Sequence, residues 1–409
     1  MHIVFLAQAF PIKSKQTGGG AANYIANMAR ILARKGHKVT VITEANDEEI
    51  FEWEGVCVHH IRATRYFKDT GRRMTTQKRI MKNIWRSIWY NYEVYQINKK
   101  DKIDIVQGTS TYNISLFRCK SIPYMIRISE HPTLLREASR EIYNFEEAIK
   151  REKLDDKMFF MALKRADMLV APSYCMKNIV RERIGRSVTV IESPVILSDY
   201  RNDVRKREKH YFLTFGLLSY RKSVHILAQI IDKLLDEYTD MEYVLVGKDL
   251  EVMKGGKYVW CSELIKSMVV RNRDRLVIEK EIFDRNELFS LIKNSQLCIL
   301  PSRSDNLSNA CLEAMALGKI VISTDKSSAE QLITDGYNGF LTKMDDEEEL
   351  YRKVRFAINL SDQDKEVIGS RAKDRVKDLT PENVYLKMMA VYTETIDKFN
   401  GRNRKDGTN

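Results

Sequence analysis

The feature that most constrains the fold is an alternation of short apolar runs with longer stretches of helical periodicity. The run His2-Ile3-Val4-Phe5-Leu6 has the length and uniform hydrophobicity of a strand buried in a parallel sheet. Residues 21–35 then repeat apolar side chains every three or four positions, and Gly36 fits the end of a helix. The apolar run 38–43 completes a strand–helix–strand unit, which implies a parallel sheet with a right-handed crossover.

The alternation continues through the N-terminal half and then starts again. Further strands are predicted at 103–107, 124–128 and 168–171. A second series is predicted to contain strands at 211–215, 243–247, 275–279, 297–300 and 320–324, with helices at 223–238, 287–294 and 309–317. Open parallel sheets bind ligands at the carboxyl ends of their strands. We therefore expect an α/β protein with two Rossmann-like, doubly wound domains that face a cleft.

The domain boundaries follow from length and polarity. The 409 residues exceed what one core supports, and residues 198–209 are polar without a clear period. We predict an N-terminal domain over 1–200 and a C-terminal domain over 201–380. Residues 381–400 are periodic and apolar, which predicts a closing helix that packs back on the N-terminal domain.

Composition narrows the environment and the partners. No run of about 18 apolar residues occurs, and the first 30 residues lack a signal-peptide pattern, so we expect a cytoplasmic chain. The six cysteines form no metal-binding or Cys-x-x-Cys pattern, as in a reducing compartment. The net charge of +12 favours acidic partners such as a nucleotide or an anionic membrane. Nucleic acid is not expected, because no zinc-finger spacing or RNA-binding aromatic motif appears.

Three segments carry candidate chemistry. Gly18-Gly19-Gly20 precedes a predicted helix, where glycines and a helix N-terminus suit a phosphate, although a flexible turn explains them equally well. The segment from Gly216 to Ser223 places Arg221 and Lys222 after a strand. Paired cations there suit a diphosphate, with a solvated basic turn as the alternative.

The third segment runs from Asp305 to Gly318 and carries two carboxylates eight residues apart. Asp305 falls in the loop after a strand, and Glu313 falls inside the helix that follows. The free backbone N–H groups of this loop suit sugar hydroxyls and phosphate oxygens. The alternative is structural: Asp305 and Ser308 cap the helix, and Glu313 is a solvated helical residue.

Together these segments resemble glycosyltransferase family 4, whose members are retaining, metal-independent enzymes of the GT-B fold. The similarity rests on the glycine loop at 18–20, on Gly216-Leu217-Leu218 to Lys222-Ser223, and on Asp305 with Glu313-Ala314-Met315-Ala316-Leu317-Gly318. The segments 166–173 and 327–341 also resemble family segments. The match spans nearly the whole chain and is most specific in its C-terminal part.

The resemblance implies a role for each candidate residue. Glu313 would hold the ribose of the donor nucleotide, and Asp305 with the backbone of the next four residues would hold the donor sugar. Lys222, with Arg221, would neutralise the diphosphate that leaves. The remaining donor-binding residues implied are Gly18, Gly19, Gly20, Gly216, Asn306, Leu307, Ser308 and Asn309. His131 lies after a strand, where the family often places a histidine near the transferred sugar, so the catalytic set expected is His131, Lys222 and Asp305.

Three departures from the family pattern stand out. Asp305 replaces the usual first glutamate, Leu217 stands where a phosphate-binding arginine is common, and Ser223 replaces a glycine.

The reaction that the resemblance implies is transfer of a hexose from a nucleotide diphosphate sugar, with a UDP-sugar favoured. The acceptor would be a glycan or a lipid-linked sugar in bacterial surface polysaccharide or glycolipid synthesis. No metal or other cofactor is expected. A GT-B enzyme of another reaction, such as an epimerase or phosphorylase, and a non-catalytic accessory subunit remain as alternatives.

A basic and aromatic segment at 62–102 suggests one further partner. On a helix, Ile80, Ile84, Trp85 and Ile88 would share one side, while Lys78, Arg79, Lys82 and Arg86 would crowd much of the rest. This pattern suits an interfacial helix on anionic lipid at the inner face of a membrane. It suits a core-packed helix with solvated cations equally well.

Overall fold

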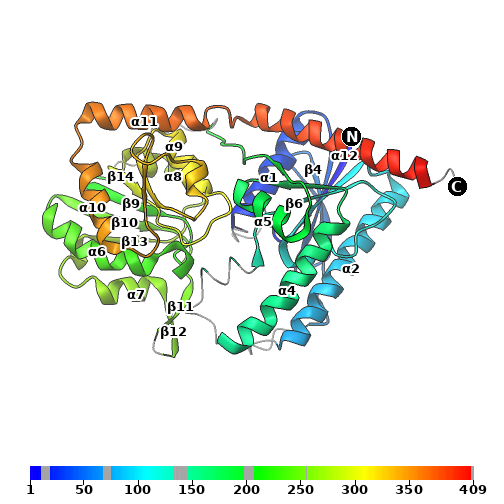
Figure 1. Cartoon of the computed structure of the whole chain (residues 1–409), viewed down its shortest axis with the longest axis horizontal. Helices are drawn as coiled ribbons and strands as arrows, with labels where there is room; N and C mark the ends of the chain where they lie inside the picture. The colour runs from blue at the N-terminus through cyan, green and yellow to red at the C-terminus, as the bar shows by residue number, and fades with distance from the viewer. Residues whose placement is uncertain are drawn as a thin grey trace. The chain divides into compact units, whose positions relative to one another are not determined.

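The computed structural model describes residues 1–10, 19–67, 75–132, 134, 138, 145–197, 207–254 and 256–406. It divides into two compact units. Unit 1 contains Met1–Thr133, Glu146–Pro194 and Pro381–Asn409, and unit 2 contains Leu134–Phe145 and Val195–Thr380. Each unit is built on its own mainly parallel sheet, as the α/β prediction requires (Figure 1).

Unit 1 is an eight-stranded sheet in the order β3-β4-β2-β1-β5-β6-β7-β8. All pairs between neighbouring strands are parallel except β3–β4. The strands are β1 (His2–Ala7), β2 (Lys38–Glu44), β3 (Glu49–Trp53), β4 (Val56–Ile61), β5 (Ile105–Thr109), β6 (Tyr124–Arg127), β7 (Met168–Ala171) and β8 (Thr189–Val190). The sequence pattern missed the β3–β4 hairpin because its side chains are largely exposed or half-buried and give no continuous apolar run.

The helices of unit 1 are α1 (Gly19–Arg34), α2 (Thr76–Lys100), α4 (Phe145–Arg165), α5 (Tyr174–Ile184) and α12 (Pro381–Asp406). The C-terminal helix α12 lies in this unit: the Tyr392 hydroxyl donates to Gln107 Oε1 on β5 at 2.5 Å, and the Tyr24 hydroxyl of α1 donates to Met388 Sδ at 3.7 Å. None of the described helices is both long enough and apolar enough to cross a membrane.

Unit 2 is a six-stranded parallel sheet in the order β13-β10-β9-β14-β15-β16. Its strands are β9 (His210–Phe215), β10 (Met241–Val246), β13 (Leu276–Glu279), β14 (Leu297–Ile299), β15 (Val321–Thr324) and β16 (Phe340–Thr342). A small hairpin, β11 (Glu251–Lys254) and β12 (Lys257–Trp260), stands apart from it. The helices are α6 (Val224–Glu237), α7 (Cys261–Met268), α8 (Arg285–Asn294), α9 (Asn309–Ala316), α10 (Glu347–Ile358) and α11 (Asp362–Val376).

Neighbouring side chains of β9 point to opposite faces of the sheet, and each face is buried in a cluster of its own. Phe212 packs into a cluster with α6, α7 and α10, whereas Tyr211 and Leu213 pack into a cluster with α8 and α9. The two clusters form the two cores expected of a doubly wound sheet.

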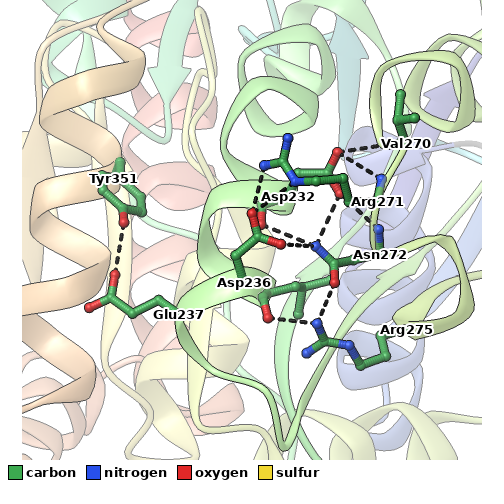
Figure 2. A network of polar contacts seen from close by, with 9 residues as sticks. Asp232, Asp236, Glu237, Val270, Arg271, Asn272, Arg275 and Tyr351 are labelled. Atoms are coloured by element: carbon green, nitrogen blue, oxygen red, sulfur yellow. Dashed lines mark hydrogen bonds and ion pairs between the residues drawn. The ribbon is translucent and has the colours of Figure 1, made fainter.

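A polar network fixes the loop between α7 and β13 (Figure 2). Asp232, buried on α6, accepts hydrogen bonds from the backbone N–H groups of Val270 at 2.8 Å, Arg271 at 3.3 Å and Asn272 at 3.0 Å. Burial opposes ionisation of Asp232, but these hydrogen bonds hold its pKa below the usual range. Asp236, one turn further along α6, pairs with the side chains of Arg271 and Asn272.

Candidate active site

The strand order of unit 2 places a ligand edge between β9 and β14. The chain runs from β9 outward through β10 to β13, then returns to the other side of β9 as β14. Open α/β sheets bind ligands where the strand order reverses in this way, beyond the carboxyl ends of the strands. The loop after β9 carries residues 216–223 and the loop after β14 carries residues 300–308, so both predicted motifs meet at this point.

The loop after β9 turns sharply at Gly216 and Ser223, and Gly216 packs closely against Gly247 after β10. Gly216 has φ +117°, and its carbonyl lies so close to Gly247 that a Cβ added there would sit 1.5 Å from the Gly216 oxygen. Ser223 has φ +53°, a left-handed conformation that favours glycine. Ser223, which stands where the family pattern has a glycine, thus adopts the turn that glycine usually makes. The strained backbone costs on the order of 1 kcal/mol.

Lys222 and Asp305 form a direct ion pair at the switch point. Lys222 Nζ donates to Asp305 Oδ2, and Arg221 Nη1 lies 3.7 Å from Asp305 Oδ1. The backbone joins the two loops as well, because the Arg303 N–H donates to the Arg221 carbonyl at 2.8 Å. Burial raises the pKa of Asp305, but Lys222 and Arg221 outweigh it and hold that pKa below the usual range.

The turn into α9 ends in a helix cap. The Ser308 side chain caps the helix by accepting from the Cys311 N–H at 3.3 Å, and Asn309 is the first helical residue. Asn306 and Leu307 form the turn between Asp305 and this cap. The capping role of Ser308 is therefore confirmed, while Asp305 serves the ion pair with Lys222 rather than the cap.

Glu313 lies within α9 and is paired with a residue that the sequence did not single out. Arg285 Nη2, at the first position of α8, donates to Glu313 Oε1 at 2.6 Å, and the Arg285 guanidinium lies 4.5 Å from the centre of the Phe289 ring. Burial nevertheless raises the pKa of Glu313, with Arg285 opposing the rise. A cation in the first turn of a helix after β13 was the only sequence signal for Arg285.

Arg303 is a second cation that the sequence did not single out. Its Nη2 lies 3.0 Å from Asp345 Oδ2, and its guanidinium lies 4.8 Å from the centre of the Tyr220 ring. Within the part of the chain that the structure describes, the buried Nε and Nη1 of Arg303 have no hydrogen-bond acceptor. Orphaned donors of this kind suit an anionic ligand.

The remaining predicted residues lie in unit 1. Gly18 falls outside the described residues, while Gly19 and Gly20 begin α1, with Gly19 at φ +70°. The strand order of unit 1 reverses between β1 and β5, so α1 starts at the ligand edge of that sheet. His131 follows β6 and is buried, edge-on to Phe159 with ring centres 5.0 Å apart.

No metal centre is evident in the described residues: none of their His, Cys, Asp and Glu side chains gather in a group of three or more that could hold an ion. Four cations, Arg221, Lys222, Arg285 and Arg303, lie on the loops and helix ends that follow β9, β13 and β14. They are accompanied by the carboxylates of Asp305 and Glu313. This arrangement can bind a diphosphate and a polyol in one place.

Comparison with known proteins identifies the family that this chain resembles. Residues 18–199 match the family described as Glycosyltransferase Family 4, and residues 197–375 match Glycosyl transferases group 1. An uncharacterized glycosyltransferase of Methanocaldococcus jannaschii is 23% identical over 93% of this chain and 95% of its own length. The gpi3 component of phosphatidylinositol N-acetylglucosaminyltransferase from Schizosaccharomyces pombe is 19% identical over 80% of this chain and 68% of its own length.

Solved structures agree on the fold. Sucrose-phosphate synthase from Thermosynechococcus elongatus superposes with a TM-score of 0.73 at 15% identity, over 96% of this chain and 98% of its own. At this identity the likeness speaks for the fold alone, and it confirms the predicted GT-B class. With the two family matches running consecutively from residue 18 to residue 375, the chain is a glycosyltransferase that belongs to glycosyltransferase family 4.

Proposed function

We propose that the chain transfers a hexose, with retention of anomeric configuration and without a metal ion, from a nucleotide diphosphate sugar to a glycan or lipid-linked acceptor. The observation that carries the proposal is the contact of Lys222 and Arg221 with Asp305 at the reversal point of the unit 2 sheet. It joins a diphosphate-binding pair of cations to a carboxylate that can accept from sugar hydroxyls.

The chemistry follows from the leaving group. Breaking the anomeric bond leaves negative charge on the diphosphate and positive charge on the sugar ring. Lys222 and Arg221 are already held in place by Asp305, so they stabilise the departing phosphate without reorganising. A front-side attack of the acceptor hydroxyl, whose proton passes to the departing phosphate, then preserves the configuration.

The donor nucleotide is proposed to lie along α9, with Glu313 accepting from the ribose hydroxyls. Gly18, Gly19 and Gly20 are proposed to contact the phosphates, and His131 is proposed to contact the transferred sugar. Leu217 cannot neutralise the diphosphate as an arginine at this position would. We assign this role to Arg303, whose Nε and Nη1 have no hydrogen-bond acceptor within the described chain. A UDP-sugar is the favoured donor.

The acceptor is proposed to be a glycan or a lipid-linked sugar at the inner face of a bacterial membrane, in surface polysaccharide or glycolipid synthesis. The name of the fission yeast relative, which joins phosphatidylinositol to N-acetylglucosaminyl transfer, supports a lipid-linked acceptor. A non-catalytic accessory role is the second candidate, favoured by Leu217 at the usual arginine position.

Product analysis tests the proposal. The purified chain is incubated in EDTA with each of several UDP-, GDP- and ADP-sugars, with and without a lipid-linked sugar as acceptor. Released nucleoside diphosphate, free sugar and glycosylated acceptor are measured. Release from one donor supports the proposal, and α-linked product from an α-linked donor supports retention. Activity that is lost in EDTA and restored by manganese contradicts metal independence. A folded, nucleotide-binding chain without turnover supports the accessory role, and an epimerised or phosphorylated sugar indicates another GT-B reaction.

A further inference from the structure

Helix α2 presents a continuous apolar and aromatic stripe on the surface of unit 1. Met81, Ile88, Tyr92 and Tyr95 have exposed fractions of 62%, 43%, 49% and 47%. They are spaced by seven, four and three residues, which places them on one side of the helix over roughly 20 Å. Isolated exposed apolar residues are ordinary, but a contiguous stripe of them marks an interaction surface.

Aromatic rings extend this stripe into a wider face. Trp85 packs edge-on against Tyr66, which is 66% exposed, and Trp89 packs edge-on against Tyr92. The Arg65 guanidinium lies 4.8 Å from the centre of the Trp89 ring. We call this set the α2 aromatic face; it consists of Tyr66, Met81, Trp85, Ile88, Trp89, Tyr92 and Tyr95.

The opposite side of α2 is occupied by the protein itself, which corrects part of the sequence prediction. Ile80 and Ile84 pack against Leu116, Met158 and Ala162, so they do not belong to a lipid-facing side. In Figure 1 α2 and α4 run beside each other, and this apolar contact lies between them.

Two of the cations assigned to the polar side are also used internally. Arg79 pairs with Asp155 on α4 at 2.8 Å. Arg86 is buried and pairs with Glu44 on β2 at 2.7 Å. The Arg86 guanidinium is therefore not a surface charge, and the Arg79 guanidinium is already engaged by Asp155.

Exposed lysines flank the α2 aromatic face at both ends, while Arg65 beside Trp89 is paired with Glu48 at 3.6 Å. Lys78 lies near one end of the stripe, and Lys99 and Lys100 lie at the other; all three are exposed. Lys99 Nζ lies 5.7 Å from the centre of the Tyr95 ring. Glu93 is the only acidic residue of α2, and it is engaged by His59 Nδ1 at 2.8 Å.

From this face we infer that α2 docks unit 1 onto an anionic lipid bilayer, with the helix lying in the plane of the membrane surface. Tyrosine and tryptophan rings favour the boundary between headgroups and acyl chains, and lysines at both ends of the stripe favour anionic headgroups. A second copy of the chain is disfavoured as the occupant, because it would bring the same cations against each other. The inference gives the proposed lipid-linked acceptor a physical basis, but it stands on unit 1 alone.

Vesicle binding tests the inference with substitutions that change only exposed side chains. The full chain is mixed with phosphatidylcholine vesicles, and separately with vesicles that contain about one third phosphatidylglycerol. Binding is expected to the anionic vesicles, and to weaken as salt is raised. The variant Met81→Ser/Ile88→Ser/Tyr92→Ser is expected to lose at least about tenfold in apparent affinity. The variant Lys78→Ser/Lys99→Ser/Lys100→Ser is expected to lose on the order of a hundredfold, on anionic vesicles only.

A matched control replaces three exposed apolar residues elsewhere in unit 1. The variant Ile50→Ser/Tyr174→Ser/Leu386→Ser changes side chains that are 66%, 57% and 56% exposed and is expected to bind like the wild type. Thermal stabilisation by a nucleoside diphosphate, measured in every variant, reports folding and the donor site independently of lipid.

Three results would overturn the inference. The first is that the wild type does not bind anionic vesicles, and the second is that the control variant loses as much vesicle affinity as the Met81→Ser/Ile88→Ser/Tyr92→Ser variant. The third is that the wild type forms a concentration-dependent dimer that only the latter variant loses, while its vesicle binding stays unchanged. If nucleoside diphosphates fail to stabilise any variant while vesicle binding follows the expected order, the donor proposal fails and this inference stands.

Discussion

Arg285 donates from Nη2 to Glu313 Oε1 at 2.6 Å, which ties the start of α8 to the carboxylate proposed to bind the donor ribose. This hydrogen bond engages one carboxylate oxygen of Glu313 and leaves the other, Oε2, outside it. Arg285 also opposes the rise in the pKa of Glu313 that burial causes. Arg285 is thus a positioning residue for Glu313.

The first prediction concerns the pH dependence of nucleotide binding. An ordinary glutamate has a pKa of about 4.3. A glutamate whose pKa is raised in the folded state therefore takes up its proton at a higher pH than this when the solution is acidified. Arg285→Ala removes the opposing cation, so it raises the pKa of Glu313 further. The midpoint below which UDP affinity falls should therefore move to higher pH in Arg285→Ala, as measured by calorimetry across pH. An unchanged midpoint would show that Glu313 does not take part in nucleotide binding.

The second prediction concerns Lys222. Lys222→Ala removes the cation that contacts Asp305 and is proposed to stabilise the departing diphosphate, so kcat should fall by about a hundredfold to a thousandfold. Lys233→Ala is a suitable control, because Lys233 is an exposed residue of α6 that pairs with Glu348. Steady-state kinetics with the preferred donor measure both. Equal kcat values for the two variants would remove Lys222 from the mechanism.

The third prediction tests whether Leu217 limits activity. Leu217 stands where the family usually carries a phosphate-binding arginine, and it is half-buried in the loop after β9. A bidentate donor there should tighten UDP binding in Leu217→Arg by about tenfold, with a smaller effect on UMP or none. If Arg303 supplies the missing charge, Arg303→Ala should weaken UDP binding and Leu217→Arg should restore it. Failure of Leu217→Arg to restore it would place the compensating cation elsewhere.

The core strands of both sheets could be predicted because strands buried in a parallel sheet have continuous apolar sequences. Strands such as Lys38–Glu44 and Met241–Val246 were found within about two residues of their observed bounds. The hairpin at Glu49–Ile61 and the helix Asp362–Val376 were not predicted, since much of their surface is exposed and their patterns are weak. The helix Glu347–Ile358 was missed although Leu350, Val354 and Ala357 recur at helical spacing.

The candidate site was predictable only where a motif carried it. Lys222, Asp305 and Glu313 lie in segments that resemble the family, whereas Arg285 and Arg303 reach the site through tertiary contacts that no local spacing records. The same limit applied to α2. The helical period grouped its apolar residues, but it could not show that Asp155 and Glu44 draw Arg79 and Arg86 inward.

A fourth prediction concerns the stability of unit 2 and uses the network in Figure 2. Asp232→Ala leaves three backbone N–H groups of the α7–β13 loop without their acceptor, which should cost about 2–4 kcal/mol of unfolding free energy. Because the folded pKa of Asp232 is depressed, its contribution is present above the unfolded pKa, near 3.9, and is lost as pH falls through the folded pKa. Urea unfolding at pH 7 and at low pH should show the difference between wild type and variant shrinking on acidification.

Asp236→Ala is the control for that comparison. Asp236 is an exposed carboxylate on the same helix that pairs with side chains of the same loop, so its loss should be smaller. Equal losses for the two variants would mean that the backbone contacts of Asp232 do not set the stability of the loop.

The central claim, that unit 2 binds a nucleotide diphosphate sugar through Glu313, is tested most directly by thermal stabilisation with a panel of UDP-, GDP- and ADP-sugars. A ligand at about one hundred times its dissociation constant should add roughly 2.7 kcal/mol to the stability of the native chain. We predict stabilisation by the sugars of one nucleotide, UDP foremost, and its loss in Glu313→Ala. Stabilisation that survives in Glu313→Ala, or none from any donor with a folded wild type, would contradict the claim.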